Sequence, residues 1–267
     1  MNSEDNNRKV LCDIAHSVFE VVNRLLSRDQ LLARELRSTE TGSRQIYREE
    51  CITVEMAATL REHFPDHVEI TLFTPPEETR TGADWYWRFE KGDFAIHARV
   101  QAKRVQRTAF GESDDQGHIV VDSPQLEHLL QATRTAAQHI DGLQAWLATY
   151  ARFNATPPCG CNNLQSCERH HHAEECADQQ PSLWIANAQE IANSGIRQAS
   201  VEQIVQNSVR LDCVLPCIDT SGASMPSPSN KGFVLQSGLQ SYKECVAIID
   251  NDSELRSEFR GALRIYQ

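Results

Sequence analysis

Apolar and polar side chains alternate along two neighbouring runs near the middle of the chain. In the first run, Trp or Phe occupies every second position from 85 to 89, with more polar residues between them. In the second run, apolar residues occupy every second position from 94 to 102 and alternate with polar residues at 97, 99, 101 and 103. A period of two is typical of a β-strand with one apolar face, so both runs are predicted to be strands. The same alternation predicts a shorter strand over 68–72, which ends before two prolines.

Apolar residues spaced three or four positions apart predict helices in other parts of the chain. This spacing extends over residues ~9–37, as one helix or a helical pair, and again over about 47–63, just before Pro65. A further helix is expected over about 124–141, and a buried strand over 144–153. After the first helical segment, the predicted order is therefore helix, three strands, helix, strand, which places the chain in the α/β class.

The turn between the two alternating runs determines which residues of the hairpin face each other. Gly92-Asp93 lies between the runs, and Gly at the first central position suits a type II′ turn. With this turn, Asp84 falls opposite Gln101. Directly opposed residues point to the same face of a sheet, so we expect Asp84, Gln101 and Lys103 to share one polar face, within reach of a common ion. A register shifted by one residue would separate them.

The composition is that of an ordinary globular chain with an acidic balance. The 267 residues are 40% hydrophobic and 24% charged, and the formal net charge is −11. This charge argues against a broad nucleic-acid surface, although the stretch 103–107 is locally basic beside the polar face. No apolar run approaches the ~20 residues that span a bilayer, and the acidic start of the chain does not resemble a signal peptide. We therefore expect a cytoplasmic protein with no membrane partner.

The residues after Phe153 differ in character from the rest of the chain. Residues 154–181 are rich in Cys, His, Asn and Gln, about 182–210 is predicted to be helical, and a Ser/Pro/Gly stretch follows over 220–231. We divide the chain into an N-terminal helical segment (1–44), an α/β core (45–153) and a Cys/His-rich extension with a helix and a mixed tail (154–267).

Thiols and imidazoles gather near the start of this extension. Cysteines in a reducing compartment are more readily thiols or metal ligands than disulfides, and the odd count of nine agrees with this. Soft ligands this close together predict a structural, tetrahedral Zn²⁺ site. The expected ligands are Cys159, Cys161, Cys167 and Cys176, with His170 as a substitute and Cys213 and Cys217 as further candidates. The alternatives are a loop with chance cysteines and a catalytic Cys–His pair, for which nothing orients a base toward one thiol.

The predicted elements and the motif residues together resemble the PD-(D/E)xK superfamily of restriction-endonuclease-like nucleases, over the predicted α/β core. The Gln-x-Lys at 101–103 is most similar to Mrr-type restriction enzymes and related defence nucleases. The stretch TGADW at 81–85, followed by VQAKR at 100–104, also resembles a bacterial domain family without an established function. The chain departs from the superfamily at Gln101, where an acid is usual. Any bound cation must then rely on Asp84 and a second carboxylate.

The resemblance implies a metal-dependent phosphodiesterase. Mg²⁺ or Mn²⁺ would be bound by Asp84, by a Glu of the preceding helix and by the Ala102 carbonyl, since Mg²⁺ prefers oxygen ligands. Lys103 would orient the attacking water and offset the charge of the phosphate. Gln101 would hold a ligand water or the scissile phosphate.

Two adjacent glutamates compete for the place of the second carboxylate. On a helical wheel, Glu49 lies near the centre of the apolar face and Glu50 lies at its edge. An acid on a buried face is costly unless it is paired or bound to a metal, so Glu49 is slightly favoured. Glu77 and Glu78, just before the hairpin, are the third choice.

The leading hypothesis is a Mg²⁺-dependent endonuclease that hydrolyses phosphodiester bonds, in DNA rather than RNA, and serves bacterial anti-phage or restriction-type defence. Its partners would be nucleic acid, a second copy of the chain and a regulatory protein. Two hypotheses from other classes stay open: a catalytically inactive nuclease-like scaffold, and a zinc-dependent protein-binding module. The acidic charge favours the scaffold, whereas the pairing of Asp84 with Lys103 opposes it.

Overall fold

The computed structural model of the protein describes several stretches of the chain. They are residues 3–35, 47–91, 94–105, 117–140, 142–152, 181–195, 198–200, 203–204, 207–211 and 215. The predicted zinc ligands (Cys159, Cys161, Cys167, His170 and Cys176), the further candidates Cys213 and Cys217, and the turn Gly92-Asp93 lie outside the described residues. The zinc site therefore stays a prediction.

A six-stranded sheet runs through the protein, in the order β1-β2-β3-β5-β6-β8. Its strands are β1 (Val68–Leu72), β2 (Trp85–Lys91), β3 (Phe94–Arg104), β5 (Gln144–Arg152), β6 (Pro181–Asn187) and β8 (Ser208–Arg210). β3 and β5 are parallel and the other neighbours are antiparallel, so the sheet is mixed. β4 (His118–Val120) and β7 (Gln198–Ser200) form a separate pair. The protein is therefore of the mixed α/β class, as the sequence predicts.

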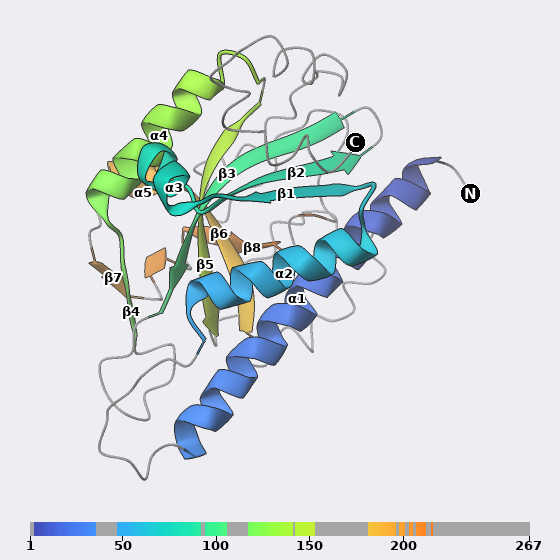
Figure 1. The fold of residues 1–267 in the computed structure, drawn as a ribbon, viewed down its shortest axis with the longest axis horizontal. Helices are drawn as coiled ribbons and strands as arrows, with labels where there is room; N and C mark the ends of the chain where they lie inside the picture. The colour runs from blue at the N-terminus through green and yellow to red at the C-terminus, as the bar shows by residue number, and fades with distance from the viewer. Residues whose placement is uncertain are drawn as a thin grey trace.

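Helices cover both faces of this sheet (Figure 1). They are α1 (Ser3–Glu35), α2 (Glu49–His63), α3 (Pro75–Thr81), α4 (Ser123–Ala136) and α5 (Ala188–Asn193). α1 and α2 pack on one face, in a core that includes Trp85, Trp87 and Trp146. α4 and α5 pack on the other face, with Tyr86 and Leu147. The central strands are therefore buried on both sides.

The order of the main elements agrees with the prediction. α2, β1, β2, β3, α4 and β5 follow one another, and the hairpin pairs Trp85 with Val100, which is the predicted register. α1 is a single helix rather than a pair. The short elements α3 and β4 were not predicted. α3 begins with a capping box between Thr74 and Glu77, and the Thr-x-x-Glu spacing is the signal that could have revealed it.

The prediction of a helix over about 182–210 is wrong. This segment forms β6, the short helix α5, and strands β7 and β8. β6 carries the unbroken apolar run from Leu183 to Ala186, and every side chain of that run is buried. Leu183 and Ile185 pack in the core with α1 and α2, and Trp184 and Ala186 pack in the core with α4 and α5. Both faces of β6 are therefore covered, and its sequence does not alternate. Such a run cannot be distinguished from a buried helix by periodicity.

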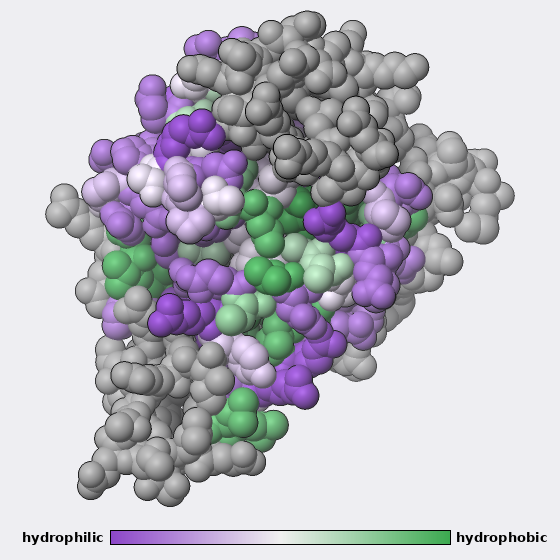
Figure 2. Space-filling model, viewed as in Figure 1, coloured by the Kyte–Doolittle hydropathy of each residue, from purple (hydrophilic) through white to green (hydrophobic). Residues whose placement is uncertain are grey.

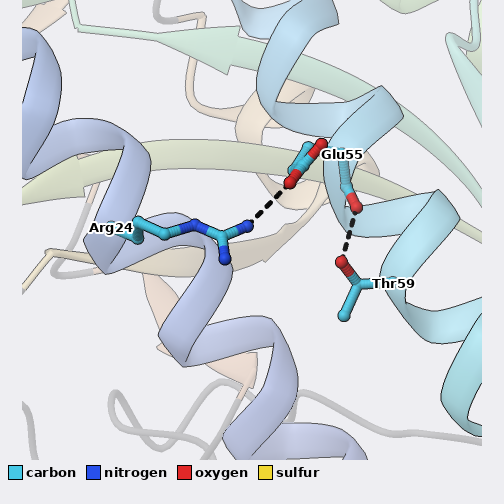
Figure 3. A network of polar contacts seen from close by, with 3 residues as sticks. All are labelled: Arg24, Glu55 and Thr59. Atoms are coloured by element: carbon cyan, nitrogen blue, oxygen red, sulfur yellow. Dashed lines mark hydrogen bonds and ion pairs between the residues drawn. The ribbon is translucent and has the colours of Figure 1, made fainter.

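An ion pair at the surface joins α1 to α2 (Figure 3). Arg24 on α1 reaches across to Glu55 on α2, with 2.7 Å between Nη2 and Oε1. One turn along α2, the hydroxyl of Thr59 donates to the main-chain carbonyl of Glu55 at 2.9 Å. The two charged side chains are 52% and 49% exposed, so the pair contributes on the order of 0.5 kcal/mol.

Polar side chains cover much of the described surface in the view of Figure 2, with apolar ones near its centre. The exposed large apolar side chains in the described part of the chain are Leu31, Val54, Leu72 and Val120. Isolated apolar side chains on a surface are normal in a globular protein. Of the helices described, none is long and apolar enough to cross a membrane.

Candidate active site

Gly82 fixes the shape of the link between α3 and β2, in which Asp84 lies. Gly82 ends α3 in the left-handed conformation, with a φ of 68°. A Cβ atom here would lie 2.2 Å from the main-chain oxygen of Gln125 and 2.3 Å from the main-chain nitrogen of Leu129, both in α4. Gly alone meets both conditions, because it has no side chain and adopts positive φ without strain. The link that carries Asp84 is therefore packed directly against α4.

The Asp84 carboxylate binds the edge of β3 at the point where β2 begins. The β2–β3 ladder starts at the pair Trp85–Val100, and β3 continues beyond it beside β5. The main-chain N–H of Asp84 donates to the Val100 carbonyl at 2.8 Å, and its Oδ2 accepts from the main-chain N–H of Ala102. The carboxylate thus takes the place of the carbonyl that a longer β2 would supply. This hydrogen bond places the carboxylate beside Ala102, the residue before Lys103.

Gln101 faces the link rather than solvent. Its side chain is 0% exposed, and its Nε2 donates to the Gly82 carbonyl at 3.3 Å. Its Oε1 is buried and has no hydrogen-bond partner among the described residues. Gln101 therefore ties β3 to the turn before Asp84, a contact that the sequence did not predict. The unpaired Oε1 is the part of the side chain that can accept a bond from a water or coordinate a cation.

Lys103 lies near the C-terminal end of β3, where Gln125 of α4 holds its amine. The Nζ of Lys103 donates to the Oε1 of Gln125 at 3.0 Å. The main chain of Gln125 also lies against Gly82. One turn of α4 therefore positions both the amine and the link that carries Asp84. Nothing in the sequence distinguishes Gln125 from the other polar residues of this helix.

Glu49 is the glutamate of α2 that lies against β3. It is the first residue of α2 and is half-buried, and the backbone of Arg104 lies close enough to act on the pKa of its carboxyl. The charge of Lys103 also acts on it. Glu50 is exposed. Glu49 is therefore the more buried of the two, as the helical wheel predicts, and its role as the ligand stays a prediction.

The two glutamates of α3 have different roles. Glu77 caps its own helix, because its Oε2 accepts from both the main-chain N–H and the hydroxyl of Thr74 at 2.7 Å. Glu78 is half-buried, and its charge acts on Asp84. Glu78 is therefore a further carboxylate of this site. The sequence ranked it below Glu49 and Glu50, because the resemblance implies a Glu on the helix before the strands.

Burial raises the pKa of these carboxylates. The pKa of Asp84 is raised to about 7, chiefly by burial. The hydrogen bond from Ala102 and the charge of Lys103 oppose this rise in pKa, and the charges of Glu78 and Glu49 add to it. Burial also raises the pKa of Glu49, with Lys103 again opposing. Several partly buried carboxylates beside the Lys103 amine form an electrostatic environment that favours a bound cation.

Thr53 and Tyr150 lie beneath the carboxylates, and neither was predicted as a site residue. The hydroxyl of Thr53 donates to the main-chain carbonyl of Glu49 at 2.9 Å and lies 2.8 Å from the hydroxyl of Tyr150. Because Thr53 has a single hydroxyl proton, Tyr150 is the donor of the second bond. Burial raises the pKa of Tyr150, and the charges of Asp84 and Glu49 add to the shift, so the phenol stays protonated.

The donors present suit Mg²⁺ or Mn²⁺. Within the described ranges, no three His, Cys, Asp or Glu side chains converge as a metal site. Mg²⁺ does not need three, because it keeps several waters and often binds one or two carboxylates. Asp84 and Glu49 supply two carboxylates, and Gln101 supplies an unpaired buried oxygen. Ala102, whose carbonyl was the other predicted ligand, lies beside Asp84.

The sequence matches a family of unknown function, DUF6615, over residues 11–260. This range covers most of the 267 residues. The chain belongs to DUF6615. A search of curated proteins finds none that matches it. The DUF6615 match starts within α1 and continues past the last described strand, so α1 belongs to the same family unit as the sheet and the Asp84 site.

Proposed function

We propose that this DUF6615 protein is a metal-dependent nuclease that hydrolyses phosphodiester bonds, in DNA rather than RNA. The observation that carries the proposal is the meeting of Asp84, Glu49 and Lys103 at one end of β3, from three separate parts of the chain. Phosphodiester hydrolysis needs ligands for a cation and a polar group that orients water beside the phosphate. Two carboxylates and an amine supply these groups.

The arrangement of elements supports the same proposal. α2, β1, β2, β3, α4 and β5 follow in the order of the PD-(D/E)xK core, which the sequence resembles. β4 and α4 connect β3 to the parallel strand β5, so β3 is central in the sheet. Beyond Val100, β3 pairs with β5 on one side and binds the Asp84 carboxylate on the other. The acid directly precedes β2, and the Lys is the second-last residue of the neighbouring strand β3.

Each side chain has a role that follows from its place. Asp84 and Glu49 would hold the cation, which when bound activates water and offsets the charge on the phosphate. Lys103, with its amine held by Gln125, would orient the attacking water. Gln101 holds the Asp84 link against β3, and its unpaired oxygen would accept a bond from a ligand water.

Cleavage of supercoiled and linear DNA with Mg²⁺ or Mn²⁺ tests the proposal. Asp84→Asn removes a cation ligand and Lys103→Ala removes the amine, so each should lower the rate at least about a hundredfold. Glu62→Gln is the matched control, because Glu62 is an exposed carboxylate near the far end of α2 and should leave the rate unchanged. Cleavage that persists in both site variants would sink the assignment.

A folded wild type that cleaves neither DNA nor RNA, and whose stability does not respond to Mg²⁺, would instead favour the inactive scaffold.

The proposal includes a role in bacterial defence and a cytoplasmic location. The defence role follows from the resemblance to Mrr-type nucleases, and the location follows from the composition. Phage plating on cells that express wild type or Asp84→Asn tests the defence role. Equal plating on both strains would contradict it.

A further inference from the structure

A deeply buried ion pair lies directly behind the proposed active site. The Nη2 of Arg104 lies 2.5 Å from the Oδ2 of Asp29, and the two side chains are 3% and 0% exposed. The Oδ1 of Asp29 accepts from the main-chain N–H of Tyr47 at 2.9 Å. Asp29 is on α1, Tyr47 lies just before α2, and Arg104 is the last residue of β3. One carboxylate of α1 therefore joins the entry of α2 to the end of β3.

The same contacts connect Glu49 with Lys103. Tyr47 precedes Glu49 by two residues, and Lys103 adjoins Arg104 in β3. The two hydrogen bonds of Asp29 hold the start of α2 and the end of β3 together. Asp29 therefore restrains the position of Glu49 relative to Lys103 from both elements.

Stability alone does not explain an ion pair at this depth. Moving two charges out of water is costly, and an apolar pair of similar volume is often at least as stable. The Nη1 of Arg104 is buried without a hydrogen-bond partner in the part of the chain that the structure describes, which adds to the cost. The exposed pair of Arg24 and Glu55 joins α1 to α2 without this cost (Figure 3). The buried pair must therefore be explained by its place beside the site.

We propose that Asp29 is a positioning residue of the active site, which acts through Arg104 and Tyr47 to hold Glu49 beside Lys103. The inference rests on the proposed nuclease function and deepens it, because it makes α1 part of the catalytic unit. Groups that orient metal ligands typically change metal affinity about ten- to a hundredfold when they are removed. Loss of Asp29 should therefore weaken cation binding.

Mg²⁺ titrations of the full chain test this inference through two readouts, thermal stabilisation and the rate of DNA cleavage. Asp29→Asn keeps an acceptor for Tyr47 and removes the charge that holds Arg104. We expect the Mg²⁺ concentration for half-maximal effect to rise at least about tenfold in both readouts, with a smaller change in kcat at saturating Mg²⁺. Arg24→Ala is the matched control, since it breaks the exposed link between the same helices and should leave the Mg²⁺ requirement unchanged.

A double variant, Asp29→Asn with Arg104→Met, separates positioning from structural support. It removes both buried charges and keeps an acceptor for Tyr47, so the Mg²⁺-free Tm should lie near that of the wild type while the Mg²⁺ requirement stays raised. A wild-type Mg²⁺ requirement in either Asp29 variant overturns the inference and leaves the nuclease proposal standing. A wild type that Mg²⁺ neither stabilises nor activates overturns both.

Discussion

Replacing Asp84 with Asn should stabilise the metal-free protein, and the gain should grow as the pH rises. Burial raises the pKa of Asp84 from 3.8 to about 7, so its ionisation is less favourable in the folded state than in the unfolded state. A carboxyl with a raised folded pKa stabilises the fold fully below its unfolded pKa, and this contribution is lost as the pH rises toward the folded pKa. Between about pH 5 and about pH 7, this one group lowers the free energy of unfolding by about 2 kcal/mol. Asn keeps an acceptor for Ala102 but has no charge to bury.

Urea denaturation of wild type and Asp84→Asn in EDTA measures this difference directly, because the other titrating groups are common to both proteins. We expect the free energy of unfolding of the variant to exceed that of the wild type by an amount that grows by about 2 kcal/mol from about pH 5 to about pH 7. Saturating Mg²⁺ should then stabilise the wild type selectively, since the variant lacks the carboxylate that binds it. A pH-independent advantage, or an equal effect of Mg²⁺ on both proteins, would refute the reasoning.

Three further predictions concern stability. Gly195 is the control for Gly82, because it has a similar φ of 67° but open space around it, so Gly195→Ala should cost only ~1 kcal/mol. Gly82→Ala should lower the free energy of unfolding in urea by well over this amount. Equal losses would contradict the close packing on α4. Burial lowers the pKa of His97 from 6.5 to about 4. The neutral imidazole therefore contributes stability that is fully present above pH 6.5. As the pH falls from 6.5 toward 4, the free energy of unfolding should drop by up to about 3 kcal/mol. In urea denaturation at several pH values, His97→Gln should not show this drop. A variant with the same pH dependence as the wild type would contradict the role of His97. Tyr150→Phe removes the donor to Thr53 and should lower thermal stability by about 1 kcal/mol; an unchanged Tm would contradict a buried bond.

The hairpin that carries the site could be predicted from the sequence because its determinants are local. Alternation identifies the two strands, and a turn of the right length sets their register, so the neighbourhood of Asp84 and Lys103 follows from counting residues. The choice between Glu49 and Glu50 is also local, since it depends on one helical wheel. Strand β6 could not be predicted in this way, because a strand buried on both faces loses the alternation that marks it.

The supports of the site could not be predicted because they depend on contacts between distant parts of the chain. Gln125 holds Lys103 across 22 residues, and Asp29 holds Arg104 across 75. Neither Gln nor Asp on the face of a helix has a local signature that distinguishes it from a solvated residue. The requirement for Gly at position 82 could not be predicted either, because it arises partly from the close packing of α4 against this residue.

The most direct measurement of the central proposal is nicking of supercoiled DNA by folded wild type and Asp84→Asn, each with Mg²⁺ or Mn²⁺ and with EDTA. If the carboxylates at the end of β3 hold a catalytic cation, the wild type nicks DNA only with metal, and the variant is at least about a hundredfold slower. Equal nicking by both proteins, or wild-type nicking that persists in EDTA, would contradict it.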